Sequence, residues 1–426
     1  MAEYVAPRGT RDVLPPETSR WQYVESKFRE MCDLYGFHEI RTPTFEHTEL
    51  FKRNLGETTD VVSKEMYTFE TRGGKSLTLR PEGTAPAIRA YVQNNLGAAM
   101  PVNKLYYIGR LFRYERPQAG RYREHTQLGM EAVGSSDPAI DAEVISFVAA
   151  FFNSIGLNDY ELKLNSIGCP ECRPAYRAAL LEYVGSRVGD LCGTCAQRYE
   201  TNPLRMLDCK EDGCKSVLAD APKLPDYLGV ECSEHFDLVK EYLAELGIVY
   251  RLDPYLVRGF DYYTKTAFEF VSGELGAQNA VGGVGRFDNL VHEIGGPVTP
   301  AIGFGLGLDR LMLTLDAMGV ELPVDSHVSV FIVTAGEAAH KAAVGIVRSL
   351  REAGISADMD YTSRSLKAQM KTAGKMGVKY TVIIGDDEIA NGTVTVKTMS
   401  ASEQAIVPVG ELANVIAKGL ARIIRD

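Results

Sequence analysis

The sequence predicts two or three domains: a large part made of strands, turns and short helices, a cysteine-rich insertion within it, and a C-terminal α/β domain. A chain of 426 residues is too long for one hydrophobic core, and an apolar content of 45% supplies ordinary globular cores. Residues 165 to 235 hold seven of the eight cysteines. Only beyond about residue 326 do apolar strands alternate with helices. We therefore expect domains over 1–325, with the insertion at 165–235, and over 326–426.

An amphipathic helix is expected near the N-terminus. Apolar residues recur there at helical spacing, at Trp21, Val24, Phe28, Met31 and Tyr35. Thr18 or Ser19 can cap the start of this helix, and Gly36 ends it. Residues 37 to about 160 and 248 to 318 then have the patterns of strands and turns.

The segment RLFRYERPQAGRYREHTQLGMEAVG (110–134) is typical of a hairpin whose polar loop spans Arg116 to Gly120. Alternation puts Arg113 and Glu115 on one face of the first strand. It also puts Gln127, Gly129 and Glu131 on one face of the second, with Leu128 and Met130 on the opposite face. The charged and polar side chains of these two faces form either part of a binding site or a solvated sheet face with cross-strand ion pairs.

Three further segments carry candidate site residues. In SLTLRPEGTAPAIRAYV (76–92), Glu82 and Thr84 lie at a strand-to-helix corner and can meet an ammonium group, although Thr84 can also act only as a helix cap. In LVRGFDYYTKTAFEFV (256–271), Arg258 precedes a strand that includes Tyr262 and Tyr263; the alternative is an aromatic core with a surface arginine. AIGFGLGLDRLMLTL (301–315) runs from a glycine-rich strand into a helix that begins near Leu306 and carries Arg310.

The C-terminal domain carries a basic stripe. Strands are expected at VSVFIVT (328–334), ADMDY (357–361) and YTVIIG (380–385), with helices at 336–353 and 363–376. On the second helix four cations lie within about 80° of one another: Arg364, Lys367, Lys371 and Lys375. Leu366, Met370 and Ala373 occupy the other side. A phosphate backbone would relieve the repulsion along the stripe, and a solvated face is the alternative.

The insertion has the cysteine spacing of a zinc site. Cys169 and Cys172 form one CxxC pair, Cys192 and Cys195 form another, and the 19 residues between them suit a zinc ribbon. Cys209 and Cys214 offer a third pair, so the choice of ligands stays open. We expect a structural Zn²⁺ held by Cys169, Cys172, Cys192 and Cys195; the alternative is reduced thiols that only pack.

Bulk composition limits the other classes. The formal net charge of -10 argues against indiscriminate nucleic-acid binding. No stretch reaches the roughly 20 apolar residues that cross a bilayer, and MAEYVAPRGTRDVLPP lacks the pattern of a signal peptide. We therefore expect a cytoplasmic protein that has reduced cysteines and does not bind membranes.

Three segments of the sequence resemble the motifs of class II aminoacyl-tRNA synthetases. RTPTFEHTELF (41–51) is similar to their dimer-forming first motif, FRYERPQAGRYREHTQ (112–127) to the second and GFGLGLDRL (303–311) to the third. LRPEGTA (79–85) and RGFDYY (258–263) resemble pieces specific to the histidyl family. The resemblance covers nearly the whole chain and implies an α+β catalytic domain with an antiparallel sheet flanked by helices, followed by an α/β anticodon-binding domain. His125 beside Thr126 departs from the family pattern, which has an aromatic and then a histidine.

The resemblance also implies the activity and the partners. Histidine and ATP would form histidyl-adenylate and pyrophosphate, with Mg²⁺ on the phosphates, and histidine would then pass to its cognate tRNA on a homodimeric enzyme. Arg113 and Arg258 would lie beside the α-phosphate, while Glu115, Arg121 and Arg310 would help to bind ATP. The implied histidine-binding residues are Glu82, Gly83, Thr84, Gln127, Glu131, Arg258, Tyr262 and Tyr263. The candidate tRNA-binding residues are Arg116, Gln118, Arg364, Lys367, Lys371 and Lys375.

Two other functions remain as alternatives. One is a non-catalytic, histidine-sensing regulatory paralogue, which the α/β C-terminal domain and the retained Arg113, Arg258 and Arg310 oppose. The other is an ATP-dependent histidine ligase with an acceptor other than tRNA. The basic stripe is the one sequence feature that argues against this ligase.

Overall fold

The computed structural model describes residues 4–56, 59–273, 280–324, 327–401 and 403–423. The chain divides into two compact units, one over 1–322 and the other over 323–426. The boundary expected between residues 325 and 326 lies outside the described residues. Among the residues that are described, no helix combines the length and the apolar character needed to cross a membrane.

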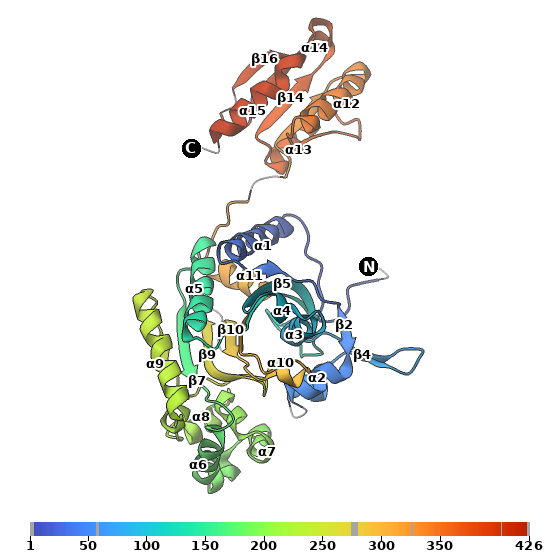
Figure 1. Cartoon of the computed structure of the whole chain (residues 1–426). Helices are drawn as coiled ribbons and strands as arrows, with labels where there is room; N and C mark the ends of the chain where they lie inside the picture. The colour runs from blue at the N-terminus through green and yellow to red at the C-terminus, as the bar shows by residue number, and fades with distance from the viewer. Residues whose placement is uncertain (1–3, 57–58, 274–279, 325–326, 402, 424–426) are drawn as a thin grey trace. The chain divides into compact units, whose positions relative to one another are not determined.

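The first unit is built on an eight-stranded sheet with the strand order β1-β5-β6-β11-β10-β9-β7-β8 (Figure 1). The inner strands pair antiparallel, whereas the short edge strands β1 and β8 run parallel to their neighbours. The strands span β1 His38–Glu39, β5 Asn103–Phe112, β6 Glu124–Val133, β7 Glu161–Ser166, β8 Arg251–Leu252, β9 Thr264–Val271, β10 Ala280–Arg286 and β11 Ala301–Gly307. The antiparallel sheet that the resemblance implies is thus confirmed.

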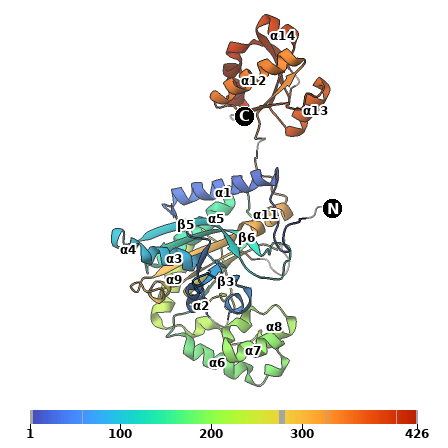
Figure 2. The ribbon, with the colours of Figure 1, turned by 90° about the vertical axis from the view of Figure 1, so that its right-hand side faces the viewer.

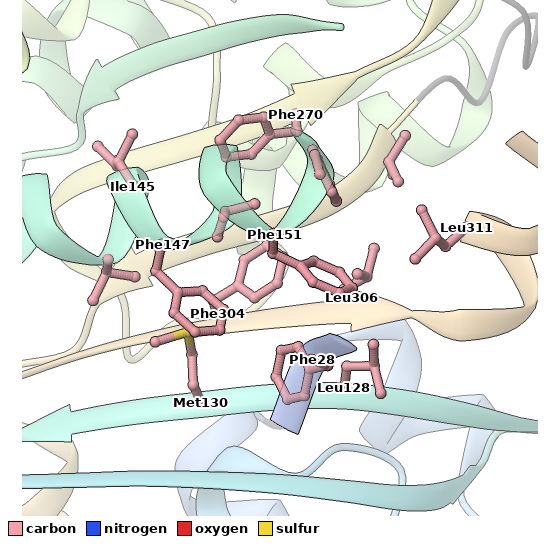
Figure 3. Close-up of a cluster of buried hydrophobic side chains, with 14 of the residues drawn as sticks. Phe28, Leu128, Met130, Ile145, Phe147, Phe151, Phe270, Phe304, Leu306 and Leu311 are labelled. Carbon is pink, nitrogen blue, oxygen red and sulfur yellow. The ribbon is translucent and has the colours of Figure 1, made fainter. Parts of the chain in front are cut away.

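Four helices cover one face of this sheet and form the main core with it. They are α1 Glu17–Leu34, α5 Pro138–Ser154, α9 Val230–Glu245 and α11 Leu308–Ala317. Phe28 of α1 meets Phe147 and Phe151 of α5 edge to face, with ring centroids 5.6 and 5.4 Å apart (Figure 3). Leu128 and Met130 of β6 point into the same core, as alternation predicts. The opposite face of the sheet is left for a site.

The helix boundaries differ slightly from those expected. α1 begins at Glu17, so Thr18 and Ser19 lie inside the helix and do not cap it. Glu17 accepts hydrogen bonds from Arg11 and Trp21, which stabilise a first turn that starts before the two hydroxyl residues. α11 begins at Leu308, because the strand β11 continues through Leu306 to Gly307.

A second layer flanks the free face of the large sheet. It contains a three-stranded sheet of order β2-β4-β3 and several short helices around a core that includes Phe51, Ile88 and Phe287. Its elements are β2 Phe45–His47, α2 Thr48–Leu55, a π-helix at Val61–Glu65, β3 Thr68–Glu70, β4 Ser76–Leu79, α3 Thr84–Gln93, α4 Leu96–Ala99 and α10 Leu290–Glu293.

The insertion between β7 and β9 packs around a small core of its own, centred on Tyr176, Leu180 and Met206. Its helices α6, α7 and α8 lie together (Figure 2). They span α6 Arg173–Gly185, α7 Gly193–Thr201 and α8 Asp212–Leu218, with 3-10 turns at Val188–Asp190, Pro203–Asp208 and Leu224–Tyr227.

The second unit is a five-stranded sheet of order β13-β12-β14-β15-β16 with helices packed on it. The strands β13, β12 and β14 run parallel, while β15 and β16 pair antiparallel. The elements are β12 Val330–Thr334, α12 Glu337–Glu352, β13 Ala357–Met359, α13 Leu366–Met376, β14 Tyr380–Ile384, α14 Asp386–Asn391, β15 Thr393–Thr398, β16 Gln404–Pro408, a 3-10 turn at Val409–Glu411 and α15 Leu412–Ile423. The α/β class expected for this domain is confirmed.

Candidate active site

A cavity of about 670 Å³ lies on the face of the large sheet that the main core leaves free. Ten residues singled out from the sequence line it: Glu82, Thr84, Arg113, Glu115, Arg121, Gln127, Arg258, Tyr262, Tyr263 and Arg310. The other candidates from the large domain do not line it: Gly83, Arg116, Gln118 and Glu131. Cys192, Thr194 and Arg198 of the insertion form part of its wall.

Glycines on neighbouring strands form the floor of this cavity. Gly305 of β11 pairs with Gly129 of β6 on one side and with Gly283 of β10 on the other. Each of four glycines lies under one site side chain, which a Cβ there would overlap: Gly283 under Arg258, Gly285 under Tyr263, Gly303 under Glu131 and Gly305 under Gln127. The glycine-rich runs therefore let functional side chains lie against the sheet.

The strand register fixes the order of these side chains along the sheet. On β10, Arg310 donates to the Ala280 carbonyl at 2.9 Å, while Arg258 lies farther along at Gly283 and Tyr263 at Gly285. The side chains above β11 follow the same order. Gln127 lies over Gly305, which pairs with Gly283, and Glu131 lies over Gly303, which pairs with Gly285. We call the arginine-rich side the open end; it comprises Arg113, Glu115, Arg121 and Arg310. We call the other side the closed end; it comprises Glu82, Tyr107, Glu131, Tyr262 and Tyr263.

Glu82 caps helix α3 from within the closed end. Its carboxylate accepts the backbone N–H groups of Thr84 at 2.7 Å and Ala85 at 2.9 Å. Helix α3 begins at Thr84 and its N-cap residue is Gly83, so the alternative considered above, that Thr84 itself caps the helix, is wrong. Burial raises the pKa of Glu82 to about 7, although both backbone donors oppose the rise. Glu82 can therefore change charge near neutral pH.

Glu131 lies behind the cavity wall and is fully buried. Its Oε1 accepts a 3.4 Å hydrogen bond from the Tyr107 hydroxyl, and its Oε2 has no hydrogen-bond partner among the residues that the structure describes. Burial raises the pKa of Glu131 well above its ordinary value. This buried oxygen lies beside Gly303, which lines the cavity, so it can accept a hydrogen bond from a ligand.

Tyr107 belongs to the site, although no sequence pattern distinguishes it from the other residues of its strand. Its ring lies against the backbone of both Gly83 and Gly129, where a Cβ would overlap it. In the sequence Tyr107 is one of several apolar residues on a long strand. The only available signal was its position opposite Gly129, which depends on the β5–β6 register.

The two tyrosines of the RGFDYY segment lie next to each other, with ring centroids 4.5 Å apart. The Tyr262 hydroxyl donates to the Tyr263 hydroxyl at 3.4 Å. Both residues precede β9, which begins at Thr264, so the expectation that they belong to a strand is wrong. A turn before the strand allows both rings to face the cavity, which strict alternation would prevent.

Arg258 lies between the two ends. Its guanidinium is 3.6 Å from Glu269 on β9 and 5.5 Å from the Tyr263 ring centroid. Within the described part of the chain, its buried Nε has no hydrogen-bond partner. Glu269, which sequence reasoning missed, helps to orient this cation within the cavity. Its position on β9 opposite Gly283 again follows from the register.

At the open end, Glu115 lies between two arginines, 3.7 Å from Arg113 and 3.4 Å from Arg121. The Arg113 Nε donates to the Pro81 carbonyl at 2.7 Å. The expectation that Arg113 and Glu115 lie on one strand face is wrong, because β5 ends at Phe112 and β6 begins at Glu124. The expected hairpin loop over 116–120 thus becomes a connection over 113–123.

His125, which departs from the family pattern, lines the cavity near the arginines. Burial, followed by the charge of Arg113, lowers the pKa of His125 to about 3. Its imidazole is therefore neutral at physiological pH and adds no positive charge to the site.

The cysteines of the insertion do not form the expected set. Cys192 and Cys195 lie with Cys209 and Cys214, whereas Cys169 and Cys172 lie with Cys232. The prediction of one site from the two CxxC pairs is therefore wrong. The chain between the pairs folds into α6 and carries the second pair away from the first, which spacing alone does not reveal.

The proposed tRNA-binding residues are only partly arranged as expected. Arg116 and Gln118 are exposed. Helix α13 begins at Leu366, so Arg364 precedes it and pairs with Asp360 at 3.1 Å. Lys367, Lys371 and Lys375 are exposed along the helix. Leu366 is also exposed, contrary to expectation, and the buried polar residue is Gln369, which bonds the backbone of Thr334.

Comparisons with known proteins agree with the motifs. Residues 9–311 match the family model described as histidyl-tRNA synthetase, and residues 329–419 match the anticodon binding domain. The histidine–tRNA ligase of Pelotomaculum thermopropionicum is 54% identical over 401 residues, with 94% of each chain covered. The histidine–tRNA ligase of Halothermothrix orenii is 52% identical over 413 residues, which cover 97% of this chain and 99% of that one. The apo S. aureus histidyl-tRNA synthetase crystal structure aligns with a TM-score of 0.82 at 38% identity, over 97% and 99% of the two chains.

Proposed function

This chain belongs to the histidyl-tRNA synthetase family, and from that premise we propose how its residues carry out the reaction. It ligates histidine to tRNA with ATP, in two steps. A carboxylate oxygen of histidine attacks the α-phosphorus, and pyrophosphate leaves with the electrons of the broken phosphoanhydride bond. The histidyl group then passes from the adenylate to a hydroxyl at the 3′ end of tRNA, and AMP leaves with the electrons of the broken acyl–phosphate bond.

The order of side chains along β10 and β11 is the observation that carries the assignment of roles. An arginine-rich end, a central Arg258 and a carboxylate-and-tyrosine end match a triphosphate, a reacting centre and an amino acid laid end to end. Histidine is already a carboxylate at neutral pH, so activation needs no general base. Charge gathers on the α-phosphate oxygens, and preorganised cations there lower the barrier by several kcal/mol. We assign Arg113 and Arg258 to that role.

We assign the closed end to histidine. Glu82, Thr84 and Gln127 would accept from or contact its ammonium group, beside Gly83. The free Oε2 of Glu131 would accept an imidazole N–H, and Tyr263, with Tyr262 behind it, would meet the other ring nitrogen. Such a site leaves its own polar atoms unpaired when another amino acid enters, which disfavours that amino acid strongly.

We assign the open end to ATP, with Glu115 and Arg121 near the nucleotide and Arg310 on the terminal phosphates. Magnesium keeps several waters and takes one or two protein carboxylates beside phosphates. Glu65 and Glu115 suit that need, because both line the cavity. Burial, followed by the charge of Glu115, raises the pKa of Glu65. Bound Mg²⁺ would neutralise phosphate charge.

We further propose that tRNA contacts Arg116 and Gln118 on the exposed connection and the lysines of α13. A homodimer is also proposed, through the RTPTFEHTELF segment. Phe45 of β2 and Phe69 of β3 are 50% and 44% exposed, and their ring centroids lie 6.3 Å apart. Phe45 belongs to the segment that resembles the dimer motif, and its exposed contact with Phe69 supports an interface there.

Histidine-dependent ATP–pyrophosphate exchange, followed by tRNA charging, tests the function. We expect both activities. A regulatory paralogue would bind histidine without exchange, and a ligase with another acceptor would exchange without charging tRNA. Either result would contradict the proposal.

A further inference from the structure

We propose that Cys192, Cys195, Cys209 and Cys214 bind one Zn²⁺ ion, and that the ion positions the loop carrying Arg258. The four Sγ atoms lie within 4.8 Å of one another, and those of Cys192 and Cys209 are 3.9 Å apart. Zn–S bonds of about 2.3 Å in a tetrahedron separate the sulfur atoms by about 3.8 Å. The cluster therefore has the ligand number and size of a closed structural zinc site.

The local backbone supports thiolate ligands at this cluster. The Cys192 Sγ accepts the Cys195 N–H at 3.4 Å, and the Cys214 Sγ accepts the Cys192 N–H at 3.1 Å. Cys192 lies at the N-cap of α7, and Cys214 lies within α8. All four thiols are free. Two helices and the turn between them thus converge on one group of sulfur atoms.

The segment between Cys195 and Cys209 contacts the RGFDYY loop directly. Arg205 donates to the Gly259 carbonyl at 2.7 Å, and Asn202 donates to Asp261 at 2.9 Å. Arg198 connects the same segment to Asp60 at 3.2 Å. Since Gly259 follows Arg258, an ion that fixes this segment would also fix the direction of the Arg258 side chain. Arg205 and Asn202 are positioning residues in this scheme.

The three-cysteine group provides a matched internal control. Cys169, Cys172 and Cys232 form a similar group with one sulfur fewer, so they do not complete a tetrahedral S₄ site. Cys32 is buried in the main core, outside both groups. Cys232→Ser and Cys32→Ser therefore remove a buried thiol without touching the proposed ligands.

The first test measures zinc by mass spectrometry in the full chain, purified without chelator. We expect about one zinc per chain in the wild type, C32S and C232S, and little in C209S or C214S. Where a variant fails to fold, Co²⁺ substitution of the wild type should give the intense visible bands of a tetrahedral thiolate site. A wild-type protein that contains no metal and takes up neither Zn²⁺ nor Co²⁺ would contradict the proposed site. So would a C232S variant that loses zinc while C209S retains it.

The second test asks whether zinc positions Arg258, so it rests on the proposed role of Arg258. The first test, which measures only metal content, does not depend on that role. Chelation of zinc should lower kcat for pyrophosphate exchange by about tenfold or more, with smaller changes in both KM values, and added Zn²⁺ should restore kcat. N202A should reduce kcat in the same direction with zinc retained. A lower melting temperature with unchanged kcat would limit the ion to a fold role and contradict the positioning.

Discussion

At the closed end of the cavity, Glu82 and Glu131 are 3% and 0% exposed, whereas at the open end the Arg113 and Arg121 side chains keep 23% and 43% of their surface exposed. Burial raises the pKa of both carboxyl groups, so the charged forms are disfavoured until a ligand arrives. The two arginines are already paired with Glu115 and remain accessible to solvent. One end is therefore suited to selecting a ligand by desolvation, and the other to stabilising charge on phosphates.

The largest effect should come from the cation between the two ends. Arg258→Ala should lower the rate of pyrophosphate exchange by at least about a hundredfold, because it removes preorganised charge from the transition state. Arg110→Ala is the matched control, since Arg110 is exposed and pairs with Glu124 outside the cavity. Near-normal exchange in a folded Arg258→Ala protein would remove Arg258 from the mechanism.

A smaller effect should distinguish the closed end of the cavity, assigned to histidine, from the open end, assigned to ATP. Glu131→Ala should cost about 1 to 3 kcal/mol in kcat/KM for histidine, because the imidazole N–H loses its acceptor in a buried site. The KM for ATP should stay nearly unchanged. Glu124→Ala, at the start of the same strand, should leave both parameters near wild type. A raised ATP KM with normal histidine kinetics would place Glu131 on the nucleotide side and invalidate the distinction between the ends.

The raised pKa of Glu82 predicts a pH dependence of stability. The folded pKa of about 7 exceeds the ordinary 4.5, so the folded protein binds more protons in this interval than the unfolded chain. Its contribution is fully present below about pH 4.5 and is lost as pH rises through about 7, with a slope of at most about 1.4 kcal/mol per pH unit. Urea unfolding of ligand-free protein from pH 5 to about 8 should show a shallower decline for Glu82→Gln than for wild type. Equal slopes would mean that Glu82 is not the titrating group.

The smallest effect lies outside both ends. Lys367→Glu with Lys371→Glu should weaken tRNA binding by several-fold, since each lost phosphate contact reduces the salt slope by roughly one. Pyrophosphate exchange should be unchanged. Lys341→Glu with Arg348→Glu, two exposed reversals on α12, gives the same change in net charge and is the control. tRNA affinity is measured by filter binding at physiological salt. An unaltered affinity would mean that these lysines form only a solvated helix face.

The sequence was most informative where physical constraints are local. Alternation along 124–133 separated the core residues Leu128 and Met130 from Gln127 and Glu131, and the structure has that division. Helical spacing found α1, and apolar runs found the strands β12, β13 and β14. The motifs identified the family, which the comparisons confirm. The roles of the site residues stay predictions.

Boundaries and missed elements show where local patterns are insufficient. No elements were expected after residue 385, where α14, β15, β16 and α15 form. β15 and β16 extend the sheet beyond β14, which formed earlier in the chain. Arg113 and Glu115 continue the alternation of β5, yet the strand ends before them, because pairing with β6 stops at Phe112. Propensity does not specify where a partner strand ends.

By itself, therefore, the sequence determined the fold class, the family and which face of the strand 124–133 is buried, because residues two apart on a strand share a face whatever surrounds them. Tertiary structure alone decided that Tyr107 and Glu269 join the site, because their places depend on the register of strands distant in sequence. It also decided which cysteines meet. Cys192 and Cys195 lie with Cys209 and Cys214 because helices intervene, and contact between sulfur atoms depends on the path of the folded chain between them.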